Sequence, residues 1–220
     1  MATPNGAGPM TDSVPKPDYW DAAVAQLMRR DRILRRIIPQ HPDVHLRTRG
    51  EPFVTLARSI VGQQISVKAA DAVWTRVLGA CAGAVTPASL TQAGFDNLRG
   101  AGLSQRKAEY VLDLAVHFEE QRVHPGQWAS MDDEDIIREL TAIRGIGRWT
   151  AEMFLIFNLR RPDVLPLDDL GLMKAISLHY FSGEPVSRFE AREVAQAWQP
   201  WSTVATWYLW RSLDPVAVEY

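Results

Sequence analysis

This chain of 220 residues has little cysteine and no long apolar run. Cys81 is its only cysteine, which excludes an internal disulfide framework, a cysteine-ligated zinc site and an iron–sulfur cluster. No apolar stretch reaches the length that a membrane-spanning helix requires. The N-terminal segment also lacks the charged and apolar regions of a secretory signal. We therefore expect a cytoplasmic protein.

An excess of basic charge is also missing. Lysine and arginine number 24 against 26 acidic residues, for a formal net charge of −2. Both signs are mixed along the chain, without a long run of either. Because bulk basic charge is the usual sign of nucleic-acid binding, any contact with DNA must depend on local features. The five histidines show no metal-ligand spacing, so we expect them at the surface or satisfied in the core.

The patterning predicts an all-α fold. Strand-like alternation is scarce, and Gly, Pro, Ser and Asp separate segments of helical length. Residues 124–128 and 160–166 contain the Pro and Gly that stop helices, and are expected to be connectors. Helices are predicted at about 18–38, 52–62, 66–79, 87–93, 95–98, 104–121, 133–143, 148–159, 168–180 and 188–213, the last with a break at Pro200.

The predicted architecture is a two-lobed helical bundle with a cleft between the lobes. Residues 1–17 are rich in Pro, Gly, Ser and Thr and are expected to form a disordered tail. A central lobe would span 52–161. A second lobe would combine 18–51 with 162–220. A monomer is the simplest expectation.

A helical hairpin is predicted at about 133–159, around "LTAIRGIGRWTAEMF" at 140–154. Gly145 and Gly147 allow positive φ and leave the backbone bare, and the second helix would begin near Arg148. Its first amides have no partner within the helix, and such amides bind phosphate. Main-chain donors of this kind would let a chain of net charge −2 hold DNA. Ser130 and Asp133 resemble a capping box for the first helix.

A second glycine turn occurs in "LRGAGLSQRKAEYV" at 98–111. Both turns could aim a helix N-terminus at a ligand, or both could be ordinary turns with Gly at positive φ. Candidate phosphate contacts are Ser104, Arg106, Lys107 and Arg148, although exposed charges are by default only solvated.

Four ordered segments resemble one known family. "IVGQQISVKAA" at 60–70, the two glycine turns, "DVLPLDDLGLMKAI" at 163–176 and "WQPWSTVATWYLWR" at 198–211 are similar to the helix-hairpin-helix/Gly-Pro-Asp DNA glycosylases. The similarity is greatest to the 3-methyladenine DNA glycosylase II branch, without the N-terminal β-domain of its larger bacterial members. It implies a monofunctional base excision repair enzyme that flips alkylated bases out of double-stranded DNA and hydrolyses the N-glycosidic bond, with no cofactor required.

The resemblance also selects a catalytic acid. In "LDDLG" it matches the second acid, Asp169, to the family's catalytic carboxylate, which would stabilise an oxocarbenium-like transition state and orient or deprotonate water. Asp168 is then expected to cap the next helix or to remain exposed. The alternative is that both are helix N-terminal acids.

The resemblance implies a pocket of large side chains. Trp149 stands where strand-cleaving members have a Schiff-base lysine, which implies that this chain leaves the strand uncut. Trp149 and Trp210 would face an alkylated, cationic base, or Trp149 could simply pack between the lobes. Met153 replaces a pocket tyrosine. The neighbouring aromatic residues Trp198, Trp201, Trp207 and Tyr208 are expected mostly in the core.

Further positions follow from the same match. Gln64 would fill the gap left by the flipped base, and Gln63 would bond the estranged base or brace the loop, unless both are only polar turn residues before a cap at Ser66. A hairpin cation, monovalent or similar, would be held by the carbonyls of Thr141, Ile143 and Ile146. Ser202 stands where relatives often have arginine, so a phosphate or structural contact is expected to be missing.

Two other functions stay open. One is a glycosylase for another lesion, such as uracil or a deaminated or oxidised purine, although an enzyme for oxidised guanine would be expected to have lysine at 149. The other is a non-catalytic DNA-binding module. Assaying base release from a panel of duplexes with different lesions would distinguish the first alternative from an alkylated-base glycosylase. An Asp169→Asn substitution without any effect would indicate the second alternative.

Overall fold

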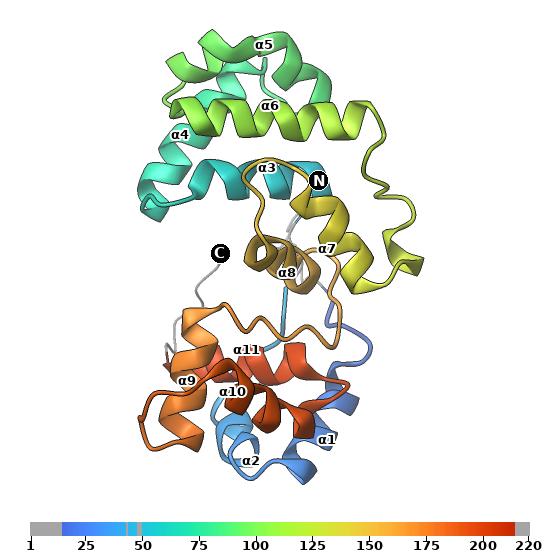
Figure 1. The fold of residues 1–220 in the computed structure, drawn as a ribbon, viewed down its shortest axis with the longest axis vertical. Helices are drawn as coiled ribbons and strands as arrows, with labels where there is room; N and C mark the ends of the chain where they lie inside the picture. The colour runs from blue at the N-terminus through green and yellow to red at the C-terminus, as the bar shows by residue number, and fades with distance from the viewer. Residues whose placement is uncertain (1–14, 43, 48–49, 214–220) are drawn as a thin grey trace, which may run out of the picture.

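The computed structural model describes residues 15–42, 44–47 and 50–213. The predicted disordered tail therefore lies almost entirely outside the described residues. The described chain forms helices and no strand (Figure 1), which confirms the all-α prediction. The α-helices are α1 (Trp20–Arg30), α2 (Leu34–Ile37), α3 (Pro52–Gly62), α4 (Val67–Ala80), α5 (Pro87–Gly100), α6 (Gln105–Glu119), α7 (Asp133–Thr141), α8 (Arg148–Phe157), α9 (Leu170–Tyr180), α10 (Arg188–Ala195) and α11 (Ser202–Leu213).

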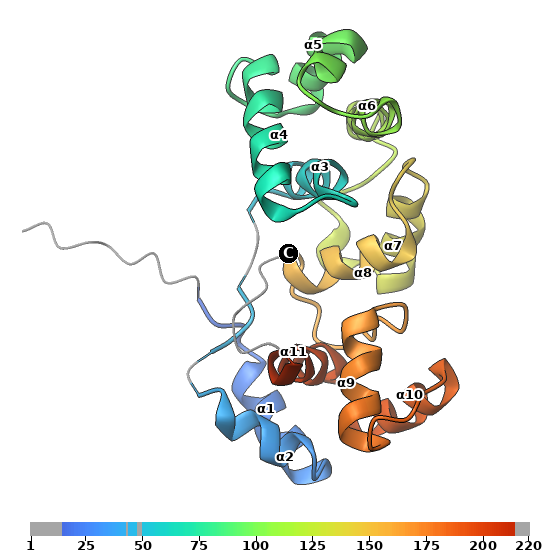
Figure 2. The ribbon, with the colours of Figure 1, turned by 90° about the vertical axis from the view of Figure 1, so that its left-hand side faces the viewer.

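The helices pack in two groups that lie one above the other in Figures 1 and 2. In the upper group α3 packs on α4, α6 and α8, while α5 packs on α6 and α7 on α8. In the lower group α11 contacts α1, α2 and α9, and α10 contacts α9. The N-terminal helices thus pack with the C-terminal ones. The chain passes from the lower group to the upper one before α3 and returns after α8.

The predicted helix over 18–38 is wrong, because Asp31 interrupts it. Its Oδ1 accepts hydrogen bonds from the amides of Ile33 (2.7 Å) and Leu34 (2.9 Å), so it binds amides at the start of a new helix, α2. Its Oδ2 accepts bonds from Tyr180 Oη at 2.7 Å and Trp198 Nε1 at 3.0 Å. Asp31 is only 7% exposed, and four donors compensate the burial of its charge.

Two predicted helix breaks are confirmed. Gly94 interrupts α5 with φ 74° and ψ 168°, which glycine adopts without steric cost. At Pro200 the chain leaves a short 3-10 helix, Gln196–Trp198, and starts α11 two residues later. The prediction that the C-terminal aromatic residues belong mostly to the core is also confirmed, since Trp198, Trp207 and Tyr208 are buried.

Ser202 makes a structural contact where one was expected to be missing. Its backbone amide and its Oγ both donate to Asp163 Oδ1, at 3.0 Å and 2.5 Å. The next residue, Thr203, donates its hydroxyl to the Arg161 carbonyl at 2.6 Å and accepts from the Val164 amide at 3.0 Å. These bonds attach the connector between α8 and α9 to the start of α11.

Among the described residues, none of the helices has the length and apolar character to cross a membrane. Nor does that part of the chain bring three or more His, Cys, Asp or Glu side chains into a group able to hold a metal ion.

Candidate active site

The predicted helical hairpin is formed by α7 and α8, and Gly145 makes its turn. Gly145 has φ +87°, and a Cβ built there would lie 2.2 Å from Cδ2 of Tyr110. Both facts require glycine at this position. Gly147 has φ −91°, so it does not use the positive φ that glycine allows. It is exposed, a Cβ added to it would meet open space, and it starts α8 without a side-chain cap.

The predicted capping box of α7 is wrong. Ser130 lies in a short 3-10 helix, Trp128–Ser130, and its hydroxyl donates to the Gln127 carbonyl at 3.0 Å. The N-cap of α7 is Asp132, and its side chain makes no capping hydrogen bond. Three acids in the first turn instead complement the positive end of the helix dipole.

Contacts from α6 and from the loop after α3 fix the hairpin turn. The Arg144 amide donates to Asp113 Oδ2 at 2.8 Å, and the Arg144 guanidinium pairs with Glu109 at 3.0 Å. Gln63 Nε2 donates to the Gly145 carbonyl at 2.8 Å. Gln63 thus braces the loop against the hairpin, which is one of its two predicted roles.

The neighbouring loop presents Gln64 to solvent. Gln64 is exposed and has φ 58°, a conformation that is uncommon outside glycine. Ile65 and Val67 beside it are 40% and 70% exposed. Ser66 caps α4 by accepting from the Ala69 amide at 3.3 Å. The insertion of Gln64 into the base stack stays a prediction.

The candidate cations near the hairpin are already engaged. Arg148 forms ion pairs with Glu134 and Glu152, so a phosphate would have to compete with two carboxylates. Lys107 donates from Nζ to the Val61 carbonyl at 2.7 Å, and burial lowers its pKa. Lys107, a candidate phosphate contact at the second glycine turn, is therefore already used within the fold.

The second glycine turn serves packing. Gly102 has φ +99°, and a Cβ there would lie 2.8 Å from the Arg76 guanidinium, which donates to the Ala101 carbonyl. The helix that follows is capped, because Ser104 Oγ accepts from the Lys107 amide at 3.2 Å. The two turns thus differ: the helix after the second is capped by a side chain, and α8 is not.

Glu152 is a buried acid beside the hairpin. It is 4% exposed, and its Oε2 has no hydrogen-bond partner. Its Oε1 accepts from Arg148 Nε at 3.0 Å. Burial raises the pKa of Glu152, and the Arg148 charge offsets part of this effect. Glu152 lines a cavity of about 400 Å³ between α7, α8, α10 and the connector before α9.

Asp169 lies at the centre of the candidate active site. It is the N-cap of α9, and its Oδ1 accepts from the Leu172 amide at 2.6 Å and from Trp210 Nε1 at 2.7 Å. Its Oδ2 accepts from Trp149 Nε1 at 3.0 Å. The residue is 6% exposed. Three donors therefore fix the position of the carboxylate.

Of the two roles predicted for Asp168, helix cap or exposed acid, the structure shows the second. Asp169, rather than Asp168, caps the helix, so the predicted catalytic acid and the cap are one residue. Asp168 is exposed, and its carboxylate pairs with Arg188. Only the second acid is directed toward the two tryptophans.

One face of α8 and one residue of α11 form an aromatic wall beside Asp169. Trp149, Met153 and Phe157 are spaced four residues apart and so share this face. Trp210 stacks on Phe157 with ring centres 5.9 Å apart and planes 10° apart. Trp149 remains 37% exposed, whereas Met153 is 8% exposed. Sequence reasoning missed Phe157, which the four-residue spacing from Met153 could have indicated.

Gly171 is a second residue that sequence reasoning missed. A Cβ added there would lie 3.1 Å from Asp169 Oδ1 and 3.3 Å from both Cδ1 and Nε1 of Trp210. A bare backbone at this position therefore leaves room for the contact between the acid and the indole. No local pattern indicates this, since the crowding comes from α11.

The hairpin residues fit the predicted cation. Thr141 is the last residue of α7, and the final carbonyls of a helix lack intrahelical amide partners. Ile143 offers a carbonyl oxygen that already accepts from the Ile146 amide at 3.1 Å and retains a second lone pair. Oxygen donors of this kind suit a hard cation. The cation itself stays a prediction.

Several known proteins are similar to this chain. YfjP of Bacillus subtilis is 35% identical over 128 residues, which are 58% of this chain and 45% of that protein; the chain thus spans less than half the length of that relative. The crystal structure of a DNA-3-methyladenine glycosidase from Bacillus halodurans matches 90% of this chain and 92% of its own, with 38% identity and a TM-score of 0.83. The 3-methyladenine DNA glycosylase Mag1 of Schizosaccharomyces pombe, solved in complex with abasic DNA, matches 89% and 98%, with 28% identity and a TM-score of 0.74.

The family assignment agrees with these likenesses. The sequence profile of the HhH-GPD superfamily base excision DNA repair proteins matches residues 57–200. That range contains the hairpin, Asp169 and Trp149, and ends just before the helix that contributes Trp210. The chain therefore belongs to the HhH-GPD superfamily of base excision DNA repair proteins.

Proposed function

We propose that this protein is a monofunctional DNA glycosylase that excises alkylated bases of the 3-methyladenine type from double-stranded DNA. The observation that carries the proposal is the buried Asp169 carboxylate, held by two indole N–H groups and one backbone amide beside the glycine hairpin. The relatives described above are named for the same activity.

Asp169 would act on the sugar rather than on the base. Breaking the N-glycosidic bond builds positive charge on the deoxyribose, and a fixed carboxylate stabilises that charge. The bonds from Trp149, Trp210 and the Leu172 amide hold the carboxylate in place before the reaction, so little reorganisation is needed. The same carboxylate can orient the water that attacks the sugar.

The aromatic side chains favour a cationic leaving base. An alkylated purine such as 3-methyladenine is positively charged, and an indole face attracts a cation by about 0.5–2 kcal/mol. Such a base already leaves readily, so a separate general acid is not required. Trp149 provides no amine, so the protein would leave an intact strand with an abasic site.

The hairpin would hold the DNA backbone through main-chain groups. The first amides of α8 lack a side-chain cap, and Gly147 leaves open space in front of them. Amides at a helix N-terminus bind phosphate. The backbone carbonyls of Thr141, Ile143 and Ile146 would hold a monovalent cation, which would supply positive charge for a nearby phosphate. We expect a monomer that works in the cytoplasm, where the chromosome is accessible.

The test is base release from methylated duplex DNA by the wild type, Asp169→Asn and Asp168→Asn. The wild type should free alkylated bases and leave an alkali-labile, uncut strand. Asp169→Asn should lose about 100-fold or more in rate, as for other preorganised electrostatic groups, while still binding DNA. Asp168→Asn is the matched control, because it removes an adjacent exposed carboxylate and should retain activity.

Other outcomes would redirect the proposal. Activity confined to uracil or to oxidised purines would reject the alkylated-base substrate. Full activity in Asp169→Asn would reject this acid. DNA binding without release of any base by the wild type would favour a non-catalytic DNA-binding module.

A further inference from the structure

Five arginines lie within the eight residues 29–36, at the junction of α1 and α2. We call them the arginine patch: Arg29, Arg30, Arg32, Arg35 and Arg36. All five are exposed. With the one acid among them, Asp31, this segment has a charge of +4. Since the whole chain carries −2, the remaining residues carry −6, and the patch is a local reversal of sign.

The patch arginines have no carboxylate partner, unlike many of the arginines elsewhere in the described chain. Elsewhere seven arginines form ion pairs with Asp or Glu: Arg58, Arg122, Arg138, Arg144, Arg148, Arg161 and Arg188. Across the described ranges, no ion pair involves a patch arginine. Arg30 donates to the Gln199 carbonyl at 2.6 Å and Arg35 to the Met28 carbonyl at 2.8 Å, so both keep their full charge.

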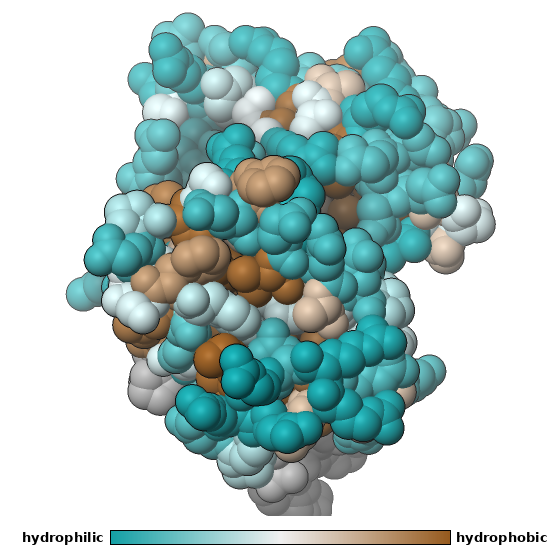
Figure 3. Space-filling model, turned by 60° about the horizontal axis from the view of Figure 1, so that its bottom comes forward, coloured by the Kyte–Doolittle hydropathy of each residue, from teal (hydrophilic) through white to brown (hydrophobic). Residues whose placement is uncertain are grey.

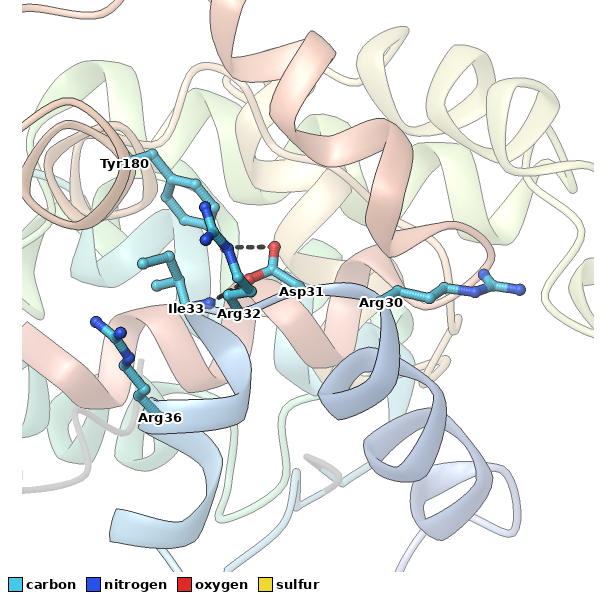
Figure 4. Close-up of a pocket in the computed structure, with 6 residues that line it drawn as sticks. All are labelled: Arg30, Asp31, Arg32, Ile33, Arg36 and Tyr180. Carbon is cyan, nitrogen blue, oxygen red and sulfur yellow. Dashed lines mark hydrogen bonds between the residues drawn. The ribbon is translucent and has the colours of Figure 1, made fainter.

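Asp31 does not neutralise its neighbours by direct pairing. It is buried, and its two oxygens accept four hydrogen bonds from neutral donors. A carboxylate has about four lone-pair sites, so its acceptor capacity is used. Figure 4 shows the bond from the Tyr180 hydroxyl to Asp31. The acid therefore organises the segment and leaves the guanidinium groups available.

Three of the arginines line a surface cavity of about 320 Å³. In Figure 4, Arg32 rises beside the Tyr180 ring and Arg36 extends on the same side, whereas Arg30 points away. The cavity is lined by Arg30, Asp31, Arg32, Ile33, Arg36 and Tyr180. The guanidinium groups of Arg32 and Arg36 make no hydrogen bond within the described residues, so both are available to an external anion.

The patch lies away from the candidate active site. Asp169 caps the first turn of α9 and Tyr180 is its last residue, so the two are separated by about 16 Å along the helix axis. Figure 1 places α2 at the lower end of the molecule, far from α3 and the hairpin. Figure 3, which brings that end forward, shows a mainly hydrophilic surface with separate apolar patches.

We propose that the arginine patch is a second phosphate-binding surface, which contacts the backbone of nucleic acid outside the lesion cleft. Guanidinium groups bind phosphate in a bidentate manner and are well suited to it. The choice of nucleic acid rests on the proposed glycosylase function. A separation of about 16 Å corresponds to about five base pairs of duplex, so only DNA that extends beyond the lesion can reach the patch.

The surface fits a protein partner or a membrane less well. Protein interfaces are centred on buried apolar and aromatic groups, and a membrane-bound helix needs an apolar face. The exposed large hydrophobic residues are Val44, Ile65, Val67, Phe95, Trp149, Leu170, Leu178 and Phe189, and none lies in 29–36. A charged surface without an exposed large apolar side chain in 29–36 is typical of non-specific contact with phosphates.

The experiment measures binding of the full chain to a long unmodified duplex over a range of salt concentrations. In Arg32→Gln/Arg36→Gln the log–log slope should become shallower by about 2, since each lost phosphate contact contributes about 0.9. Binding to the long duplex at low salt should weaken. Excision from a short lesion duplex, which does not reach the patch, should stay at the wild-type rate.

The control is Arg122→Gln/Arg138→Gln, which makes the same change in net charge at two exposed arginines that are paired with acids. Its slope should match the wild type. An unchanged slope in the patch variant would overturn the proposal. Loss of binding to phosphatidylserine vesicles or to polyglutamate, with DNA binding intact, would also overturn it and assign the patch to a membrane or an acidic protein. Absence of excision by the wild type would count against the proposed function alone.

Discussion

Gly171→Ala separates the geometry of the active site from the stability of the fold. The substitution adds one methyl group 3.1 Å from Asp169 Oδ1 and 3.3 Å from Trp210 Nε1. Cβ atoms rarely come this close to other groups, so the acid or the indole must move by a few tenths of an ångström. Both partners of the 2.7 Å bond between Asp169 and Trp210 are affected.

The expected changes in stability nearly cancel. Replacing glycine by alanine in a helix stabilises it by about 0.8–1 kcal/mol. An extra methyl group in a packed site costs about 1–3 kcal/mol. The net change of about 0–2 kcal/mol in the free energy of unfolding would lower Tm by a few degrees in a domain of this size. Activity should fall much more, by about tenfold, because a displacement of about 1 Å at a catalytic group can cost 100-fold.

The assay is single-turnover base release, with DNA affinity and Tm measured on the same sample. Gly79→Ala is the matched control, because Gly79 lies in α4 and a Cβ there meets nothing within 4 Å. It should raise Tm slightly and leave the rate unchanged. If Gly171→Ala released bases at the wild-type rate, the contact between Asp169 and Trp210 would not matter for catalysis.

Three further substitutions test other parts of the site. Gly145→Ala should destabilise the fold by about 3 kcal/mol or more in chemical denaturation, since it combines φ +87° with a clash against Tyr110. Gly147→Ala should change stability by less than about 1 kcal/mol, yet weaken DNA binding in an anisotropy titration by blocking the α8 amides. Glu152→Gln addresses a carboxyl whose pKa burial raises above 4.5. Ionisation of Glu152 in the folded wild type therefore lowers its free energy of unfolding as pH rises through the folded pKa. The variant has no such carboxyl, so its Tm relative to wild type should be highest near neutral pH. That difference should shrink as pH falls through the folded pKa and be smallest below 4.5, and a constant difference would contradict the assignment.

Local sequence predicted most helices, because Gly and Pro end or interrupt a helix through their own backbone geometry. The turn of the hairpin and the break at Gly94 are examples. The break at Asp31 was not predictable in this way. Its side chain is held by Tyr180 and Trp198, which are 149 and 167 residues away in sequence. Without them, the periodicity of 18–38 favours one continuous helix.

The candidate site depended on the family resemblance, and its details depended on tertiary contacts. Asp169 could be selected over Asp168 as the catalytic candidate by matching the motif, but local sequence did not indicate which of the two acids caps α9. The bonds from Trp149 and Trp210 span 20 and 41 residues. Gly171 is constrained only by a residue on α11, so its importance could be seen only after the helices were placed.

The distribution of charge explains how an acidic chain can act on DNA. Near the hairpin, Arg144 and Arg148 are paired with acids, so contacts there fall mainly to backbone amides, which add no net charge. Release of counterions by cationic side chains gives protein–DNA binding its salt dependence. The hairpin should therefore contribute little to that dependence, and the arginine patch should contribute much of it. Positioning of the lesion and general attraction to DNA would then be assigned to opposite ends of α9.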